Sequence, residues 1–158
     1  MAKTAKIEVK EQGLIASMQG FFKTLLKKGE INGLMVPQRL PGKNAVMPTL
    51  ITDPEKINGT DPLAPVFPMN AAKVVSKLTR KPLYGRVAVV LRPCEIRAFV
   101  ELVKLKQART EDVVLVGLDC LGSYSNVDYL RFAGENGDGS TQKFFQNALS
   151  GKTTAWED

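Results

Sequence analysis

The sequence predicts an α/β fold, with a single domain over residues 1–158 in which a mixed sheet carries helices on both faces. Two apolar, β-branched runs at residues 87–91 and 113–116 lack polar alternation, which favours central strands of a parallel sheet, covered on both faces. Residues 93–112 between them are long enough to form the crossover that parallel neighbours require. We therefore expect a parallel strand-helix-strand unit at the centre of the sheet.

A β-hairpin is expected at the edge of the same sheet. Residues 33–40 and 45–51 are short apolar segments joined by a Pro-Gly loop at 41–44, which is typical of a hairpin. Pro37 and Pro48 each remove a backbone donor from a strand, so the hairpin should lie at an edge or carry a bulge.

Helices are predicted before and after the hairpin. Residues 11–29 carry one broad apolar stripe, and Gly29 is placed to end that helix. Asp53, followed by proline, predicts one or two helical turns, and Asn70 is placed to cap a helix that ends before Pro82.

Two segments of the chain are expected to be irregular. Residues 58–68 form a proline-rich loop too apolar to be left in water, so it must pack either as a functional wall or simply as part of the core. Residues 134–140 are rich in glycine and small polar residues, which predicts flexibility. Short helices are expected on either side of the second segment, around 124–132 and at 141–149.

Composition narrows the possible functions. The net charge of +6 is spread along the chain without the clustering and interleaved aromatics of a nucleic-acid binder, so we expect no nucleic-acid partner. The absence of histidine excludes hydrolytic triads and histidine-rich zinc sites. No apolar run approaches the ~20 residues of a membrane span, and the start lacks a signal-peptide core, so a cytoplasmic location is expected.

The only two cysteines follow the two predicted parallel strands. Cys94 and Cys120 should both lie just past the carboxyl edge of the sheet, where open α/β sheets bind ligands. Cys94 lies in the first turn of a predicted helix, near Arg92 and Arg97, and the positive helix end favours its thiolate.

Three interpretations of the thiols stay open at this point. They are small buried hydrophobic residues, a redox disulfide, or metal ligands. A 4Fe-4S cluster is ligated by four thiolates, so two cysteines cannot hold one by themselves. Further ligands would then come from outside this chain.

The segments around the cysteines resemble a known family. They read Leu-Arg-Pro-Cys-Glu-Ile-Arg-Ala at 91–98 and Gly-Leu-Asp-Cys-Leu-Gly at 117–122, with Thr-Asp-Pro at 52–54, Pro-Leu-Ala-Pro at 62–65 and Asn-Ala-Ala at 70–72. Over roughly residues 13–130 the chain is similar to the amino-terminal part of the coenzyme F-420 hydrogenase/dehydrogenase β-subunit family.

This resemblance implies an electron-transfer oxidoreductase subunit that holds a 4Fe-4S cluster and FAD in the full-length protein. Electrons would pass between a hydrogenase or formate dehydrogenase partner and a deazaflavin (coenzyme F-420) or a similar acceptor. Cys94 and Cys120 are implied as metal ligands, and no catalytic residue is assigned. The implied cofactor-binding residues are Arg92, Pro93, Asn70 and Ser76.

Family members continue past this region with further cysteines, including a Cys-x-x-Cys, whereas this sequence ends at Asp158. We therefore expect a truncated domain or one part of a split subunit, inactive alone, whose cofactor sites are complete only at full length. The alternative is a non-catalytic assembly module that docks partner redox subunits. A homo-oligomer is compatible with either interpretation.

Overall fold

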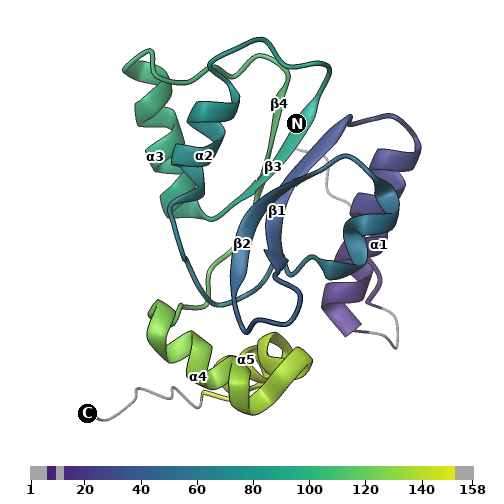
Figure 1. Cartoon of the computed structure of the whole chain (residues 1–158), viewed down its shortest axis with the longest axis vertical. Helices are drawn as coiled ribbons and strands as arrows, with labels where there is room; N and C mark the ends of the chain where they lie inside the picture. Colours follow the sequence, from purple (N-terminus) through teal and green to yellow (C-terminus); the bar gives the residue numbers. More distant parts are fainter. Residues whose placement is uncertain (1–6, 10–12, 152–158) are drawn as a thin grey trace.

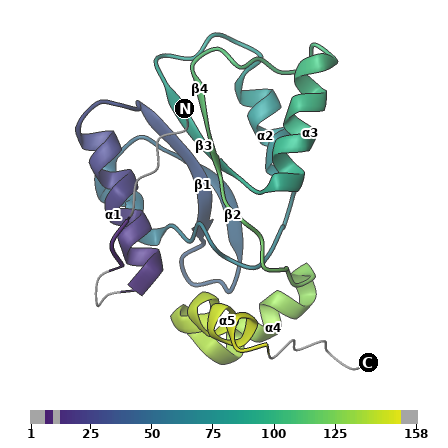
Figure 2. The same ribbon diagram turned by 180° about the vertical axis from the view of Figure 1, so that it is seen from behind.

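The computed structural model of the chain describes residues 7–9 and 13–151. Its centre is one four-stranded sheet with the strand order β2-β1-β3-β4, and helices cover both faces (Figure 1, Figure 2). The strands are β1 Gly33–Arg39, β2 Val46–Ile51, β3 Val87–Leu91 and β4 Val113–Gly117. The predicted α/β class with a mixed sheet is confirmed.

The strand pairing matches the two predicted units. β1 and β2 form an antiparallel hairpin, and β3 pairs in parallel with β1 on one side and β4 on the other. Only β2 of the hairpin lies at the sheet edge. Pro37 is tolerated in β1 because the pairing with β3 ends at Met35, and the Pro37 carbonyl instead accepts a hydrogen bond of 2.8 Å from the Asp61 N–H.

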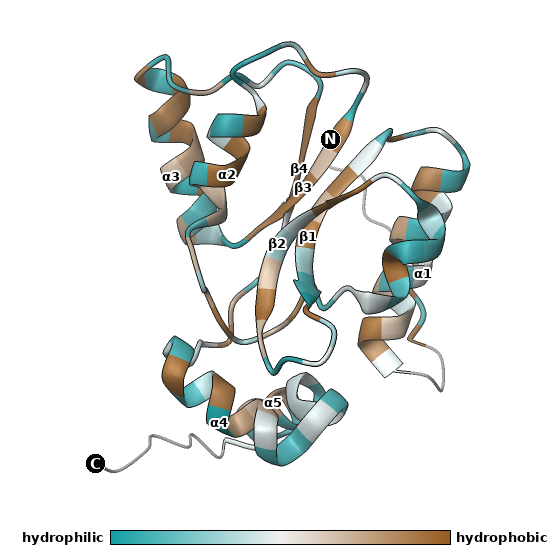
Figure 3. Cartoon of the chain, viewed as in Figure 1, coloured by the Kyte–Doolittle hydropathy of each residue, from teal (hydrophilic) through white to brown (hydrophobic). Residues whose placement is uncertain are grey.

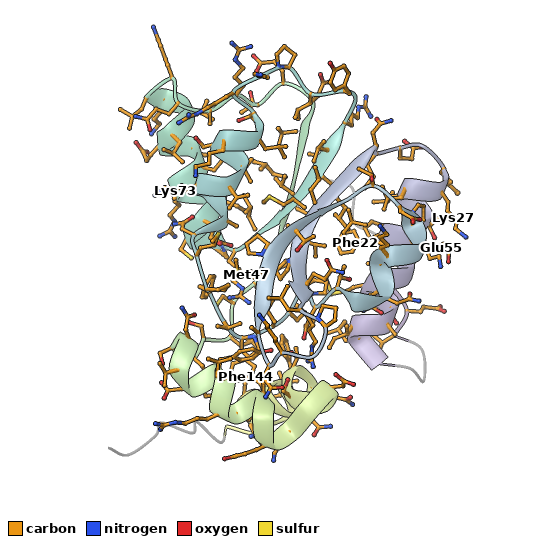
Figure 4. The ribbon with its side chains drawn as sticks, viewed as in Figure 1. Phe22, Lys27, Met47, Glu55, Lys73 and Phe144 are labelled. Carbon is orange, nitrogen blue, oxygen red and sulfur yellow. The ribbon has the colours of Figure 1, made fainter. Side chains whose placement is uncertain are left out.

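β3 is buried on both faces because its side chains alternate between two cores. Ala88 and Val90 point towards α1 (Gly13–Lys27), where Phe22 is only 1% exposed (Figure 4). The alternate side chains of β3 pack against α2 (Ala71–Leu78) and α3 (Pro93–Lys104). Burial of a side chain such as Phe22 contributes roughly 2 kcal/mol, so these two layers hold the helices to the sheet.

The prediction that β4 is also central and fully covered is wrong. β4 is the last strand of the described sheet, and Val114 and Leu115 are 39% and 41% exposed, although the strand is as hydrophobic as β3 (Figure 3). The crossover helix α3 is likewise not buried all round, since Val100 is 41% exposed. Hydropathy alone could not reveal this, because it does not show which strand has a neighbour on each side.

The remaining elements are short helices. η1 (Pro54–Gly59) begins after Asp53, whose side chain accepts from the Glu55 N–H at 3.0 Å, as predicted. Its Glu55 forms ion pairs with Lys23 and Lys27 of α1, at 2.8 and 3.1 Å (Figure 4). The start of the first helix at residues 11 and 12 lies outside the described residues.

The C-terminal part of the described chain is helical. It comprises α4 (Asn126–Asn136), η2 (Gly137–Gly139) and α5 (Ser140–Leu149). The glycine-rich stretch 134–140, expected to be irregular, is therefore the end of one helix and a tight 3-10 turn before the next. Among the described helices, none is long and apolar enough to cross a bilayer.

A buried ion pair fixes these C-terminal helices to the end of the sheet. Arg39 donates from Nε and Nη2 to Oδ2 of Asp61, at 3.0 and 2.8 Å. Thr141 of α5 donates to the same oxygen at 2.6 Å, and Arg39 Nη2 also reaches Ser140 Oγ at 3.1 Å. Asp61 is 1% exposed and the Arg39 side chain 23%, so this cluster joins β1, the loop after η1 and α5 in a largely buried site.

We expect Asp61→Ala to lower the free energy of unfolding by on the order of 3 kcal/mol, because it leaves the Arg39 charge without its partner in a largely buried site. Urea unfolding followed by circular dichroism measures the loss. The matched control is Glu101→Gln, which removes an exposed ion pair to Lys104 and should cost about 0.5 kcal/mol or less. Equal losses in the two variants would contradict a stabilising role for the buried pair.

Tyr129 of α4 gives a second prediction. Burial, assisted by the charge of Asp61, raises the pKa of its phenol above the usual 10.0. The protonated phenol therefore stabilises the fold at every pH below 10, and this contribution is lost as the pH rises through the folded-state pKa. Unfolding free energies measured across alkaline pH should fall more steeply for the wild type than for Tyr129→Phe, and parallel curves would refute the assignment.

Candidate functional site

The candidate site lies at the carboxyl edge of β3 and β4. Leu91 of β3 is paired with Gly117 of β4, and the Leu118 N–H donates to the Leu91 carbonyl at 3.0 Å. Cys94 and Cys120 each follow these paired residues by three positions. The parallel register therefore brings the start of α3 and the loop after β4 to the same edge, as the sequence predicts.

Arg92 is the residue at the centre of this edge. It is 7% exposed, precedes the first turn of α3, and lies over the ring of Phe67 with its guanidinium carbon 3.9 Å from the ring centroid. Its Nη2 donates to the Ala64 carbonyl, whereas its buried Nη1 has no hydrogen-bond partner among the described residues. Burial lowers the pKa of the guanidinium, and the nearby charges of Cys120, Glu95 and Cys94 oppose that shift.

Glu95 holds the starts of two helices together. It is 6% exposed, and its Oε1 accepts from the Ala71 N–H of α2 at 2.8 Å while its Oε2 accepts from the Arg92 N–H at 3.1 Å. No role for Glu95 was predicted from the sequence. A glutamate three residues after the helix N-cap is a capping-box signal, which could have revealed the bond to Arg92, although not the one to Ala71.

Two hollows meet at Arg92. The first, here called the thiol hollow, is lined by Arg92, Asp119 and Cys120, together with Phe144 and Phe145 of α5. The second, the apolar hollow, extends from Arg92 and Glu95 along hydrophobic residues of the sheet and of the proline-rich loop. Its apolar lining includes Met35, Val46, Pro62, Phe67 and Met69.

The proline-rich loop therefore does more than fill the core. Pro62 lines both hollows, the Ala64 carbonyl accepts from Arg92, and Phe67 lies against its guanidinium. A bridge between Val66 and Tyr124 ties the loop to the segment after β4. Of the two interpretations left open for this loop, the wall of a site fits its position.

Both thiols are free and exposed in the structure. Cys94 lies in the first turn of α3, and Cys120 Sγ donates to the Gly122 carbonyl at 3.5 Å. Among the described residues, no three His, Cys, Asp or Glu side chains group closely enough to hold a metal ion. The described part of the chain thus offers two thiols at one edge and no third ligand beside them.

The structure brings together some of the other predicted cofactor-binding residues and separates one. Pro93 is exposed beside Arg92. Asn70 caps α2, accepting from the Ala72 N–H at 3.0 Å, and α2 starts next to Glu95. Ser76 is 5% exposed near the other end of α2, where its hydroxyl donates to the Gln107 carbonyl at 2.7 Å. A contact between Ser76 and a cofactor stays a prediction. The Ser76 hydroxyl already has a structural partner in the Gln107 carbonyl.

We expect Cys94 to be alkylated several-fold faster than Cys120 when each is the only cysteine, in Cys120→Ser and Cys94→Ser variants. Cys94 lies exposed in the first turn of α3, at the positive end of the helix dipole, whereas the Cys120 thiol donates to a carbonyl in a loop next to Asp119. Iodoacetamide rates followed by mass spectrometry measure the difference. A faster reaction at Cys120 would show that the helix end does not control thiol reactivity here.

No family model matches the chain. The F420-dependent formate dehydrogenase subunit beta of Methanocaldococcus jannaschii is 28% identical to it over 115 residues, which are 73% of this chain and 30% of that protein. The F420-dependent formate dehydrogenase 1 subunit beta of Methanococcus maripaludis is 27% identical over 107 residues, which are 68% of this chain and 27% of that protein. The match thus spans less than a third of either relative, and this similarity to β subunits of F420-dependent dehydrogenases confirms the family resemblance that the sequence motifs indicate.

Proposed function

We propose that this chain is a redox-subunit domain that, in a full-length protein, helps to hold a 4Fe-4S cluster and FAD. Electrons would pass between a hydrogenase or formate dehydrogenase partner and coenzyme F-420 or a similar acceptor. The similarity to two formate dehydrogenase β subunits supports the redox role and the presence of partner subunits. The observation that carries the site is the register of β3 and β4, which brings Cys94 and Cys120 to one edge beside Arg92.

The described residues fit part of such a cofactor site. Two exposed thiols can supply two of the four thiolates that a 4Fe-4S cluster wants, and the remaining ligands must come from elsewhere. Arg92, Pro93 and Asn70 lie around the same edge and would contact the flavin. A cluster bound there would supply one-electron transfer, and the role of these residues is to bind and orient it on rigid helix and strand ends.

A docking module is the second candidate function, and the exposed edge of β4 favours it. Val114 and Leu115 are adjacent, so they point to opposite faces of the sheet, and both are well exposed. Among the described residues β4 has no neighbour on its outer side, and a strand edge that is apolar on both faces is a surface to which another polypeptide can add a strand. In this function the domain would assemble redox subunits without holding a cofactor itself.

Anaerobic reconstitution of the full-length protein with iron, sulfide and FAD distinguishes the two functions. We expect broad visible absorption and bound iron in the wild type, and loss of most of the iron in Cys94→Ser/Cys120→Ser, because half of the thiolate ligands are then missing. The control Glu101→Ser, on an exposed position of α3, should keep the iron of the wild type. An unchanged spectrum and no bound iron in the wild type would favour the docking module.

A further inference from the structure

A second surface lies at the end of the molecule opposite the candidate site. α2 and α3 both end there, at the top of Figure 1, whereas α4 and α5 lie at the other end. Each helix is followed by a loop, at residues 79–86 and 105–112, that leads into β3 or β4. The Arg109 N–H of the second loop donates to Thr79 Oγ1 of the first at 3.2 Å. The two loops therefore form one surface, here called the amino edge.

The amino edge carries more positive than negative charge. Its basic residues are Arg80, Lys81, Arg86, Lys106 and Arg109, and its acidic residues are Glu111 and Asp112. All five basic residues are exposed, and none of them takes part in an ion pair between described residues. The dipoles of α2 and α3 also attract cations, but that effect is confined to the last helical turn, and Arg86 and Arg109 lie beyond it. Folding thus gathers an excess of positive charge that attracts anionic groups.

An exposed aromatic side chain belongs to the same surface. Tyr84 is 100% exposed, and Leu105 of the other loop is 64% exposed. The loop around Tyr84 is held in place, because the Asn32 side chain accepts from the Arg86 N–H at 3.0 Å and the Asn32 N–H donates to the Arg86 carbonyl at 2.7 Å. Gly85 has a φ of +85°, and a Cβ atom there would overlap Asn32 Oδ1, so this turn requires glycine. A loop fixed in this way loses little conformational freedom when its aromatic ring binds a partner.

We propose that the amino edge docks an acidic face of a partner protein, whose carboxylates pair with Arg80, Arg86 and Arg109 and whose apolar side chains pack on Tyr84. Tyrosine and arginine are enriched among the residues that contribute most to binding in protein interfaces. A guanidinium also binds a carboxylate through two parallel hydrogen bonds, which suits an acidic partner.

The aromatic content of the two loops favours a protein over the other anionic partners. Single-stranded nucleic acids stack successive bases on aromatic rings along a groove, and membrane surfaces bind amphipathic helices. The loops offer the single ring of Tyr84 and no helix of that kind. Because the amino edge lies opposite Cys94 and Cys120, a partner bound there leaves the candidate site open. The proposal uses neither that site nor the outer edge of β4, so it does not rest on the proposed function.

Two labelled peptides test the docking surface, one of repeated Glu-Glu-Leu units and one of repeated Gln-Gln-Leu units. In fluorescence anisotropy titrations at physiological salt, which screens remote charges, the 158-residue chain should bind the acidic peptide on the order of 10-fold more tightly than the neutral one. Arg80→Glu/Arg109→Glu should lose most of that preference, because two attractions become repulsions. The matched control Arg131→Glu/Lys143→Glu makes the same change in charge at exposed positions of α4 and α5 and should keep it.

Tyr84→Ser leaves the charge unchanged and should weaken binding of the acidic peptide several-fold, because its leucines lose the ring on which they pack. The control Val127→Ser, at a 60% exposed position of α4, should not. Unchanged binding by Arg80→Glu/Arg109→Glu, or an equal loss in its control, would overturn the surface. Unchanged binding by Tyr84→Ser would show attraction between charges alone and reject a protein interface. Tighter binding of single-stranded DNA of equal net charge, or of phosphatidylserine vesicles, than of the acidic peptide would assign the surface to phosphate ligands instead.

Discussion

The buried ion pair between Arg39 and Asp61 is the interaction on which the arrangement of the site depends. It joins the end of β1, the proline-rich loop and α5, three parts that are far apart in the sequence. Removing two charges from water is costly, and here a two-point contact from Arg39 and a hydroxyl from Thr141 offset that cost. Because α5 is held in this way, its Phe144 and Phe145 line the thiol hollow.

Arg92, the other buried arginine near this end of the sheet, has different partners from those of Arg39. Arg39 meets a carboxylate, a threonine and a serine, whereas Arg92 meets a carbonyl, an aromatic ring and two hollows. None of the ion pairs between described residues includes Arg92, although the charges of Cys120, Glu95, Cys94 and Asp61 oppose the lowering of its pKa by burial. A buried guanidinium with one unpaired nitrogen is more typical of a ligand site than of a structural core. The contrast explains why the candidate site centres on Arg92 rather than on the thiols alone.

The exposed edge of β4 links the fold to the question of partners. A strand with the hydropathy of a central strand, but without a neighbour on one side among the described residues, has backbone groups and side chains available for a further strand. The relatives are more than three times as long as the region that matches this chain. Both observations are compatible with the redox function and with the docking function proposed above.

The sequence by itself determined the local features of this protein. The apolar runs, the Pro-Gly loop and the capping residues Asp53 and Asn70 act through backbone geometry and nearest neighbours, so the strands, the hairpin and the helix starts could be predicted. The position of Cys94 and Cys120 at one edge of the sheet could be predicted because each follows one of two parallel, neighbouring strands. The glycine-rich stretch 134–140 was misjudged, because composition does not report the contacts that turn it into the end of one helix and a tight turn.

Only the tertiary structure decided which buried polar groups meet. Asp61 and Arg39 are 22 residues apart, and Glu95 and Ala71 are 24 apart, so no local pattern reveals that they are partners. The same holds for the outer edge of β4 and for the Arg92 nitrogen, which have no neighbour and no partner among the described residues, since each depends on what other parts of the chain leave uncovered. Hydropathy measures the tendency of a residue to be buried, whereas burial itself is a property of the neighbours that the fold supplies.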